Sequence, residues 1–391
     1  MIKQKRILLV SPFFYPEPIS TGKFNTDIAL ALKDLNYDVT VLCSHPFYPE
    51  WKPIKTNQTI KGLNIVRGGR FVRYPKSLLI RRAVLEVWFA LFILKNISLF
   101  RKHFDIILTI FPPSLSFNII IPFLKKEAKK IGVVHDLQEI YISKSKGYFN
   151  KIIGFFINKI EGRSLRACDK LIFLSNEMKK EAKMLYNLTD EKLEVQYPFV
   201  NINTNKITND LNNILSQDKK HVVYSGALGK KQYPDKLYEF YEYASKKLEN
   251  TEFHFFSQGP NFENLKNYNK NNKIKFHPLV SEKHINELYK KSNVQIIPQY
   301  PGSSKGSLPS KLPNLLASGS NILIITDKNS EIEKLFNKYN LDGVVNLWDN
   351  ELICTKLNEL IEKGPGPNIN QMNVARNFFK IDYMINKIVE K

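Results

Sequence analysis

The chain has 391 residues, 43% hydrophobic and 12% aromatic, so it can bury the cores of two domains and is not of a disordered composition. Its 58 Lys and Arg against 37 Asp and Glu give a net charge of +21, which indicates an anionic partner such as nucleic acid, an anionic bilayer or a phosphorylated substrate. Three dispersed cysteines form neither a disulfide framework nor a metal motif, and no apolar run suits a signal peptide or a membrane span, so we expect a cytoplasmic protein without metal or cofactor.

Short apolar runs alternate with helical stretches through the first 200 residues. The first strand is followed by a loop and by a helix expected from about Phe24 to Leu35. This alternation predicts a parallel sheet covered on both faces, with ligands at the carboxyl ends of the strands. The expected strands are residues 6–10, 38–42, 64–67, 105–109, 132–135, 170–174 and 193–196.

Two strand ends in this half carry residues suited to a ligand. In the first loop, which contains Tyr15, Gly22 would let backbone approach a ligand closely, although a merely flexible loop explains it as well. A later strand ends in His135-Asp136, where the imidazole can bond a substrate hydroxyl or shuttle its proton. Asp136 can orient that ring or cap the following helix, and a structural histidine beside a helix cap remains the alternative.

Two apolar stretches are candidates for contact with a membrane surface. Residues 83–94 lie between Arg81-Arg82 and Lys95, too short to span a bilayer, and suit an interfacial helix or a core helix. We favour membrane contact for this stretch because aromatic residues and basic flanks occur together. For residues 148–160 we expect the core face of a helix. Its stripe consists of Ile152, Ile153, Phe156, Ile157 and Ile160.

A polar joint, residues 201–220, precedes a second alternating series. Its strands are expected at residues 221–225, 252–258, 273–277, 294–298 and 321–325, with helices at 234–248 and 282–291. Glycines and lysines follow the first of these strands, and close-approach loops follow the next ones. The loop residues that we expect to line one cleft are Gly226, Gly229, Lys230, Lys231, Gln258, Gly259, Pro278 and Leu279.

Residues 305–319 are the most informative stretch of this half. Pro309 and Ser310 favour a helix start there, and Gly319 favours its end. The unpaired N–H groups of a first helical turn attract anions, and Lys305 and Lys311 add charge. We predict a diphosphate site; an ordinary strand–loop–helix joint is the alternative.

The domain prediction follows from these patterns. Residues 1–200 form the first domain, 201–220 the joint, 221–367 the second domain, and 368–391 a terminal helix that can return to the first domain.

Several motifs together resemble a known family. They are residues 7–17 with Gly22, His135-Asp-Leu137, Ala167–Ser175, Tyr224–Gln232, Pro298-Gln299, and Leu308-Pro-Ser-Lys-Leu312 with Ala317-Ser-Gly319. The pattern resembles the retaining family 4 glycosyltransferases of the GT-B class that build bacterial capsule, O-antigen and colanic-acid-type polysaccharides. That resemblance implies an α/β fold with two tandem Rossmann-like doubly wound domains facing each other across a cleft.

The resemblance also implies site roles. The second domain would bind a UDP- or GDP-sugar through the loop residues named above together with Gln299, Ser310, Lys311 and Leu312, and Gly22 would approach the donor from the first domain. The first domain would bind a polyprenyl-diphosphate-linked saccharide through Tyr15, His135 and Asp136 at the cytoplasmic membrane surface. His135, Lys231 and Lys311 would be catalytic in a front-face, retaining transfer whose main catalytic contribution is stabilisation of the leaving diphosphate.

One departure and three alternatives remain. The E-x7-E pair of many family members matches about Gly306 and Asn314 here, so the usual glutamate contacts to the sugar are missing. The net charge of +21 is also compatible with three other functions. The protein could be a nucleotide-sugar epimerase of the same architecture, or a non-enzymatic protein that binds anionic membranes or nucleic acid. The dispersed basic residues and the lack of a recognised module argue against nucleic acid.

Overall fold

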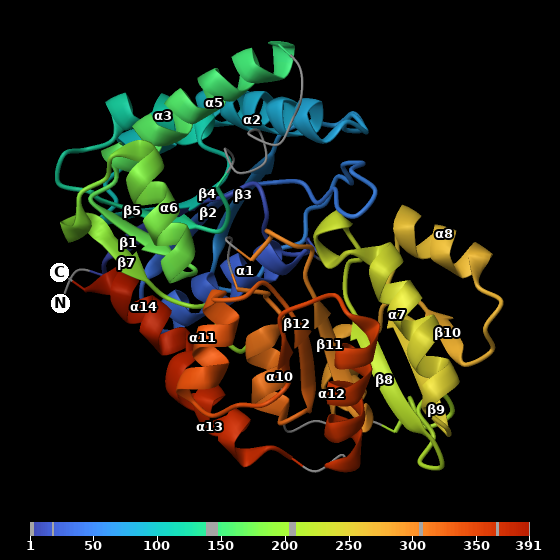
Figure 1. The fold of residues 1–391 in the computed structure, drawn as a ribbon. Helices are drawn as coiled ribbons and strands as arrows, with labels where there is room; N and C mark the ends of the chain where they lie inside the picture. The colour runs from blue at the N-terminus through green and yellow to red at the C-terminus, as the bar shows by residue number, and fades with distance from the viewer. Residues whose placement is uncertain are drawn as a thin grey trace. The chain divides into compact units, whose positions relative to one another are not determined.

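The computed structural model describes residues 4–17, 19–137, 148–202, 209–304, 308–364 and 367–390. The chain divides into two compact units (Figure 1). The first unit consists of Met1–Tyr197 with Ile381–Lys391, and the second unit is Pro198–Lys380.

The first unit is built on a seven-stranded parallel sheet in the order β3-β2-β1-β4-β5-β6-β7. Its strands are β1 (Arg6–Val10), β2 (Asp38–Ser44), β3 (Asn64–Gly68), β4 (Ile106–Phe111), β5 (Lys129–Val134), β6 (Lys170–Phe173) and β7 (Leu193–Val195). The central strands are apolar on both faces, because helices cover both, which confirms the parallel sheet predicted from the alternation.

The helices of the first unit are α1 (Ser20–Asp34), α2 (Leu78–Lys95), α3 (Leu115–Ile120), α5 (Tyr148–Ala167), α6 (Asn176–Tyr186) and α14 (Ile381–Val389). Side chains of α2, α3, α5 and α6 share one core with Leu8 and Val10 of β1. Helices α1 and α14 contact each other. The expected start of α1 at Phe24 is wrong by four residues, so Gly22 lies in its first turn.

Helix α14 belongs to the first unit although it ends the chain. The Lys387 ammonium bonds the Glu194 carboxylate of β7 at 2.6 Å, and Lys170 of β6 bonds the same carboxylate at 2.8 Å. These two ion pairs join the terminal helix to the β6–β7 edge of the sheet.

The second unit has a six-stranded parallel sheet in the order β10-β9-β8-β11-β12-β13 (Figure 1). Its strands are β8 (Lys220–Ser225), β9 (Thr251–Phe256), β10 (Ile274–His277), β11 (Val294–Pro298), β12 (Ile322–Ile325) and β13 (Val344–Val345). Its helices are α7 (Pro234–Lys247), α8 (Pro260–Tyr268), α9 (Ile285–Lys291), α10 (Leu312–Ser318), α11 (Glu331–Lys338), α12 (Asn350–Glu362) and α13 (Ile369–Phe378). One sheet face forms a core with α7, α8 and α12, which confirms a second Rossmann-like domain.

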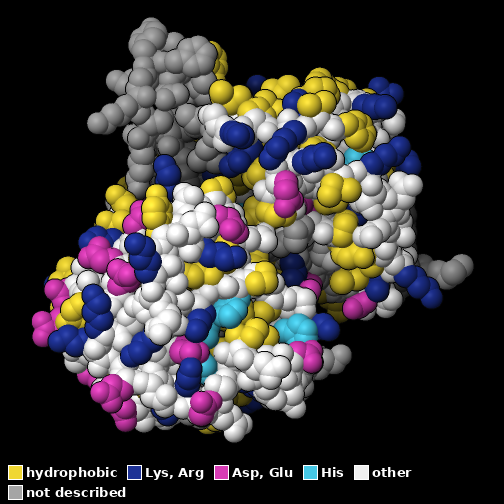
Figure 2. Space-filling model, turned by 90° about the vertical axis from the view of Figure 1, so that its right-hand side faces the viewer, with side chains coloured by type: hydrophobic (Ala, Val, Ile, Leu, Met, Phe, Trp, Pro, Cys, Tyr) yellow, Lys and Arg dark blue, Asp and Glu magenta, His cyan; other side chains and the backbone are white. Residues whose placement is uncertain are grey.

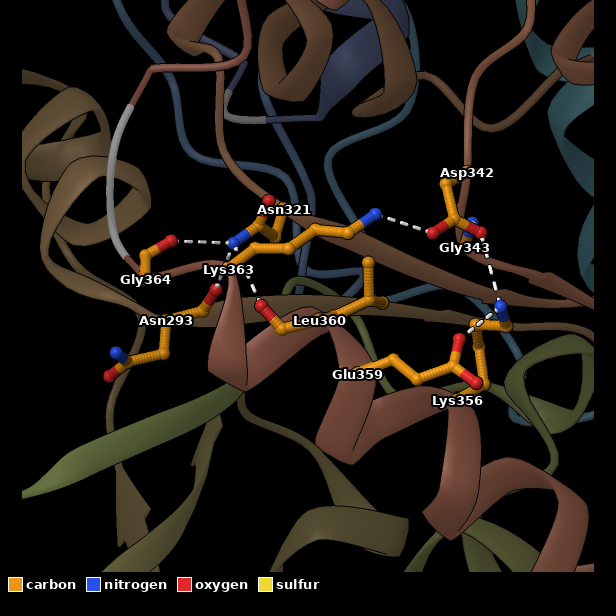
Figure 3. Close-up of polar contacts among 9 residues, drawn as sticks. All are labelled: Asn293, Asn321, Asp342, Gly343, Lys356, Glu359, Leu360, Lys363 and Gly364. Carbon is orange, nitrogen blue, oxygen red and sulfur yellow. Dashed lines mark hydrogen bonds and ion pairs between the residues drawn. The ribbon is translucent and has the colours of Figure 1, made fainter.

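A polar cluster holds the end of α12 against this sheet (Figure 3). The buried Asn321 side-chain amide donates to the carbonyl oxygens of Asn293, Leu360 and Gly364 at 2.9–3.2 Å. Nearby, the Asp342 carboxylate accepts bonds from Lys356 and Lys363. The start of β12 and the end of α12 are therefore joined through side chains as well as through the apolar core.

Gly343, beside this cluster, tolerates no side chain. Its φ is +110°, and an added Cβ would lie 1.9 Å from the backbone oxygen of Ile322. We expect Gly343→Ala to lower the free energy of unfolding of the second unit by about 3 kcal/mol, because strain and a backbone clash add. Gly364→Ala is the matched control: its φ is +73° with open space around the Cβ, so only the conformational cost of about 1 kcal/mol applies. Urea unfolding of the two variants measures the difference, and equal losses would contradict the clash.

Candidate functional site

Four neighbouring strand ends of the second unit carry most of the predicted donor-binding residues. Gly226 follows β8, Gly259 closely follows β9, Pro278 follows β10 and Gln299 follows β11, and these strands are adjacent in the sheet. Gly226 has φ +123° and Gly259 has φ +97°, and a Cβ at either position would meet nothing within 4 Å. Both turns therefore present backbone to open space, the geometry that lets a ligand approach the main chain.

Some of the remaining loop residues are exposed, and the others form hydrogen bonds within the protein. The exposed set comprises Lys230, Lys231, Gln258, Pro278 and Leu279. The Gly229 N–H is bonded to the Gln232 side chain at 3.0 Å. Gln299 lies within the framework, since its side-chain oxygen accepts the Thr326 hydroxyl proton and its carbonyl oxygen accepts the Trp348 indole N–H.

The expected helix start at Ser310 is wrong, because α10 begins at Leu312. The Leu312 N–H is taken by the carbonyl of Pro309 at 2.9 Å, and Pro313 has no N–H, so the first turn offers fewer free donors than a helix start normally does. The Leu312 side chain is fully buried and cannot contact a ligand. Ser310 is exposed, Gly319 ends the helix with φ +72° as expected, and Lys305 and Gly306 lie outside the described residues.

Lys311 is a half-buried residue whose ammonium lies beneath the strand ends. Its ammonium donates to the carbonyl oxygens of Ser225 at 3.2 Å and Ile296 at 2.8 Å, and it lies 4.4 Å from the centre of the Tyr224 ring. The β8–β11 ladder pairs only Val222 with Val294 and Val223 with Gln295, so the lysine fills the gap where the strands diverge. Desolvation lowers the pKa of Lys311 from 10.5 to about 7.

Asn314, at the position of a missing glutamate, has a structural partner. Its side chain forms two hydrogen bonds with Asn201, to the backbone N–H at 2.9 Å and to the side-chain oxygen at 2.7 Å. The amide therefore ties α10 to the segment that enters the second unit.

In the first unit, the close approach at Gly22 is to protein. A Cβ there would lie 2.8 Å from the backbone oxygen of Glu17, so the glycine permits the loop to pack on the first turn of α1. The Glu17 carboxylate accepts the N–H groups of Phe47 and Tyr48 at 2.9 and 2.8 Å, and burial raises its pKa to about 7. The sequence reading missed this buried carboxyl, because its two partners are 30 residues away. Tyr15 is exposed beside it.

His135 lies at the end of β5 with an unused ring nitrogen. The ring packs edge-on against Phe24 of α1 with centroids 4.7 Å apart, and its buried Nε2 has no hydrogen-bond partner among the residues that the structure describes. Burial lowers the pKa of His135 to about 3, so the ring is neutral at physiological pH. Asp136 accepts the Leu137 N–H at 3.2 Å, and in the described part of the chain no hydrogen bond joins it to His135. The orientation of the ring by Asp136 stays a prediction.

Helix α2 has two apolar faces. One is buried in the core, and its Glu86 carboxylate accepts the N–H groups of Ser114 and Leu115 at the start of α3. The opposite face is exposed. It consists of Ile80, Val87, Trp88, Leu91 and Leu94, each 40–55% exposed. We call these five residues the α2 stripe; they lie within about 120° of the helix circumference.

Basic residues flank the α2 stripe in the sequence, and Figure 2 shows hydrophobic and basic side chains interspersed on the upper part of the face that it draws. Arg73, Lys76, Lys95, Arg101 and Lys102 are exposed. On α5, Phe155 and Phe156 are 64% and 56% exposed, so the prediction that Phe156 faces the core is wrong; the side chains of Ile152 and Ile153 lie outside the described residues. Within the described ranges, no helix combines the length and hydropathy needed to cross a bilayer.

Comparison with known proteins is consistent with these features. Residues 21–204 match the model of Glycosyltransferase Family 4. Sucrose-phosphate synthase from Thermosynechococcus elongatus is similar with a TM-score of 0.72 and 13% identity over 98% of this chain and 96% of that one. WaaG, a glycosyltransferase involved in lipopolysaccharide biosynthesis, has a TM-score of 0.71 and 12% identity over 98% and 100%.

A third structure, described as trehalose-6-phosphate from E. coli bound with UDP-2-fluoro glucose, has a TM-score of 0.68 and 9% identity over 99% and 100% of the two chains. No curated protein matches the sequence. The structural likeness establishes the two-domain fold, and the family model covers the half that carries Gly22 and His135. Residues 21–204 therefore carry the Glycosyltransferase Family 4 signature, and the chain as a whole has the two-domain GT-B fold.

Proposed function

We propose that the protein transfers a sugar, with retention, from a UDP- or GDP-linked donor to a polyprenyl-diphosphate-linked saccharide during bacterial surface-polysaccharide synthesis. The observation that carries the lipid-linked acceptor is the α2 stripe, an exposed apolar helix face flanked by cations in the family 4 half. The acceptor of such an enzyme is held in a membrane, and its catalytic unit has to work at that surface.

The second unit supplies the donor site of this proposal. The turns at Gly226 and Gly259 would receive the diphosphate and the nucleoside on backbone, and exposed Lys230 and Lys231 would add charge. Lys311 lies one layer below, bonded to the carbonyl of Ser225, the residue before Gly226. Its buried charge would stabilise the departing diphosphate through the field rather than as a direct ligand. A UDP-sugar analogue bound to a protein of the same fold supports this class of donor.

The first unit supplies the acceptor hydroxyl site. The neutral imidazole of His135, whose Nε2 has no partner among the described residues, can bond a hydroxyl without displacing another of their bonds. Tyr15 and Asp136 are half-buried or exposed near the same strand ends of that unit. In the proposed front-face reaction the acceptor proton leaves with help from the donor phosphate, so His135 positions the hydroxyl and no enzyme nucleophile is needed.

Membrane attachment completes the proposal. The α2 stripe can enter the interface between headgroups and acyl chains, while the surrounding arginines and lysines meet anionic headgroups. Because each half-exposed apolar side chain adds a modest transfer free energy, several together with the basic residues are needed for stable attachment. The net charge of +21 acts in the same direction.

One experiment tests both donor binding and membrane attachment. We expect Val87→Ser/Trp88→Ser/Leu91→Ser to bind anionic vesicles of phosphatidylglycerol and phosphatidylethanolamine at least about tenfold more weakly than wild type, because apolar area at the interface is lost. Transfer to a vesicle-borne polyprenyl-diphosphate acceptor should fall with it. Calorimetric binding of UDP or GDP should stay unchanged. Vesicle sedimentation and labelled sugar in the lipid extract are the readouts.

The matched control replaces three exposed apolar residues of the second unit. Leu347, Leu352 and Ile369 are 52–64% exposed, and their serine variant should bind vesicles like wild type. If this control also loses vesicle binding, the total exposed apolar surface of the protein, rather than the α2 stripe, determines attachment to the vesicles. If wild type binds neither UDP nor GDP and labels no lipid, the proposed reaction is wrong.

A further inference from the structure

Three histidines lie side by side on the sheet of the second unit, and His277, the last residue of β10, directly precedes Pro278. His221 is on β8, His254 on β9 and His277 on β10, three neighbouring strands. The alternate residues of β9, Phe253 and Phe255, belong to the core beneath α7, so His254 faces the opposite side of the sheet. His221 and His254 are essentially inaccessible to solvent. Buried imidazoles on a sheet face that usually packs apolar side chains require an explanation.

The rings form a continuous hydrogen-bonded row. His221 Nδ1 lies 2.9 Å from His254 Nε2, and His254 Nδ1 lies 3.1 Å from His277 Nε2. The row ends at the Ser216 carbonyl, 2.8 Å from His221 Nε2. Because a carbonyl only accepts, His221 Nε2 carries a proton, and a neutral His221 therefore presents the lone pair of Nδ1 toward His254. Burial lowers the pKa of all three histidines, which keeps the rings neutral.

A carboxylate completes the group. Glu252 precedes His254 by two residues on the same face of β9, and its Oε2 lies 3.9 Å from His254 Nε2. Its other oxygen, Oε1, is held by Lys219 at 2.6 Å, with Lys275 at 4.0 Å. The lysines thus orient the carboxylate so that one oxygen faces the imidazoles. The nearest ligand atoms of His221, Glu252 and His254 all lie within 4.8 Å of one another.

We propose that His221 Nδ1, His254 Nε2 and Glu252 Oε2 bind a transition-metal ion, for which Zn²⁺ is the best match. Two imidazoles and one carboxylate favour zinc over magnesium or calcium, which prefer all-oxygen sites. Tetrahedral zinc with ligand bonds of about 2.0–2.1 Å places two ligand atoms about 3.3 Å apart. The His221–His254 and Glu252–His254 separations of 2.9 Å and 3.9 Å lie on either side of that spacing, and the third pair lies within 4.8 Å, so the three side chains have to close around the ion when it binds.

The outer partners fit this assignment. Ligating histidines normally donate their second N–H to a carbonyl or another acceptor, and the Ser216 carbonyl already fills that role for His221. On metal binding the proton of His254 Nε2 moves to Nδ1 and bonds His277 Nε2, whose own proton moves to its Nδ1. No ring changes its charge. The fourth position is left for water.

The proposed metal site would be structural rather than catalytic. Its ligands are His221 near the beginning of β8 and the second and fourth of the six residues of β9, whereas Gly226 and Gly259 lie beyond the carboxyl ends of these strands. A metal there joins two neighbouring strands, with the β10 histidine as outer support. The two lysines beside Glu252 oppose a cation and weaken binding, so we expect a site that stabilises the protein at micromolar zinc.

The test uses the full chain after chelator treatment. Calorimetry should show one Zn²⁺ per chain, and zinc should raise the melting midpoint by several degrees. Co²⁺ should give the intense visible bands of a four-coordinate site with nitrogen ligands. Glu252→Gln keeps the acceptor for Lys219 but removes the anionic ligand, and it should weaken zinc binding at least tenfold; His221→Gln should do the same. His277→Asn, which removes only the outer partner, should weaken it by about 10- to 100-fold.

His103→Gln is the control, since His103 is a partly exposed histidine of the first unit that pairs with Asp105. It should bind zinc like wild type. Absence of zinc binding by folded wild-type protein, or Glu252→Gln and His221→Gln variants that bind as tightly as wild type, would overturn the proposal. The cobalt spectrum of wild-type protein tests the site even if the variants do not fold. A six-coordinate spectrum without strong visible bands would also contradict the site.

Discussion

Lys311→Met should lower kcat/KM for the nucleotide-sugar by about 100- to 1,000-fold while the protein still folds. Removing one preorganised charge or donor from the developing leaving-group charge typically has this effect. The Lys311 ammonium is buried directly beneath the turn at Gly226, where low dielectric strengthens its field. Methionine keeps the length and the packing of the chain but carries no charge.

The pH dependence separates charge from packing. Burial lowers the folded pKa of Lys311 to about 7, against 10.5 as its ordinary value. Between these values the unfolded chain binds the proton and the folded chain does not, so wild type gains stability as pH rises from 7 toward 10.5. Lys311→Met lacks this gain, so the stability difference between the two proteins should change with a slope of at most about 1.4 kcal/mol per pH unit.

The activity should titrate in the opposite sense. As pH rises above 7 the free enzyme loses the ammonium form, and kcat/KM of wild type should fall, whereas that of Lys311→Met should be flat in this range. The bound diphosphate favours the ammonium, so the descending limb of kcat should lie at higher pH than that of kcat/KM. The control is Lys246→Met, an exposed lysine at the end of α7. A Lys311→Met enzyme with wild-type kcat/KM and the same pH profile would exclude the electrostatic role.

Local patterns in the sequence were sufficient for the architecture. The apolar runs of four to seven residues predicted the parallel strands, because buried strands between helices are apolar on both faces. The turns at Gly226 and Gly259 were found from glycine at the end of a strand, since positive φ is a local property. The exposed face of α2 followed from aromatic residues with basic flanks.

Contacts between residues far apart in the chain could not be predicted from local sequence patterns. Ser310 and Pro309 are good helix starters, yet α10 begins at Leu312, because the Lys311 ammonium is drawn to carbonyls of β8 and β11. The row His221, His254 and His277 has no metal-like spacing along the chain, since parallel strands separate its members by more than twenty residues each. Sheet register alone brings them together.

His135→Phe should lower kcat by about 100-fold or more and leave the protein at least as stable as wild type. A positioned imidazole contributes about this much to transfer from a hydroxyl. In the described part of the chain the buried Nε2 of His135 has no partner, and such an atom costs about 1–3 kcal/mol, which phenylalanine removes while keeping the edge-on contact with Phe24. Steady-state kinetics and thermal unfolding of the same preparation measure both effects.

Opposite signs of the two effects distinguish a ligand-binding residue from a structural one. A histidine kept for packing would lose stability and activity together, and His135→Gln, which retains a polar group, would then be no better than His135→Phe. Burial lowers the pKa of His135 to about 3, against 6.5 ordinarily, so wild type should lose stability relative to His135→Phe as pH falls from 6.5 toward 3. The same neutral ring predicts no His135 limb in kcat/KM between pH 5 and 8. An unpartnered nitrogen retained at a cost in stability is the mark of a group whose partner is the substrate.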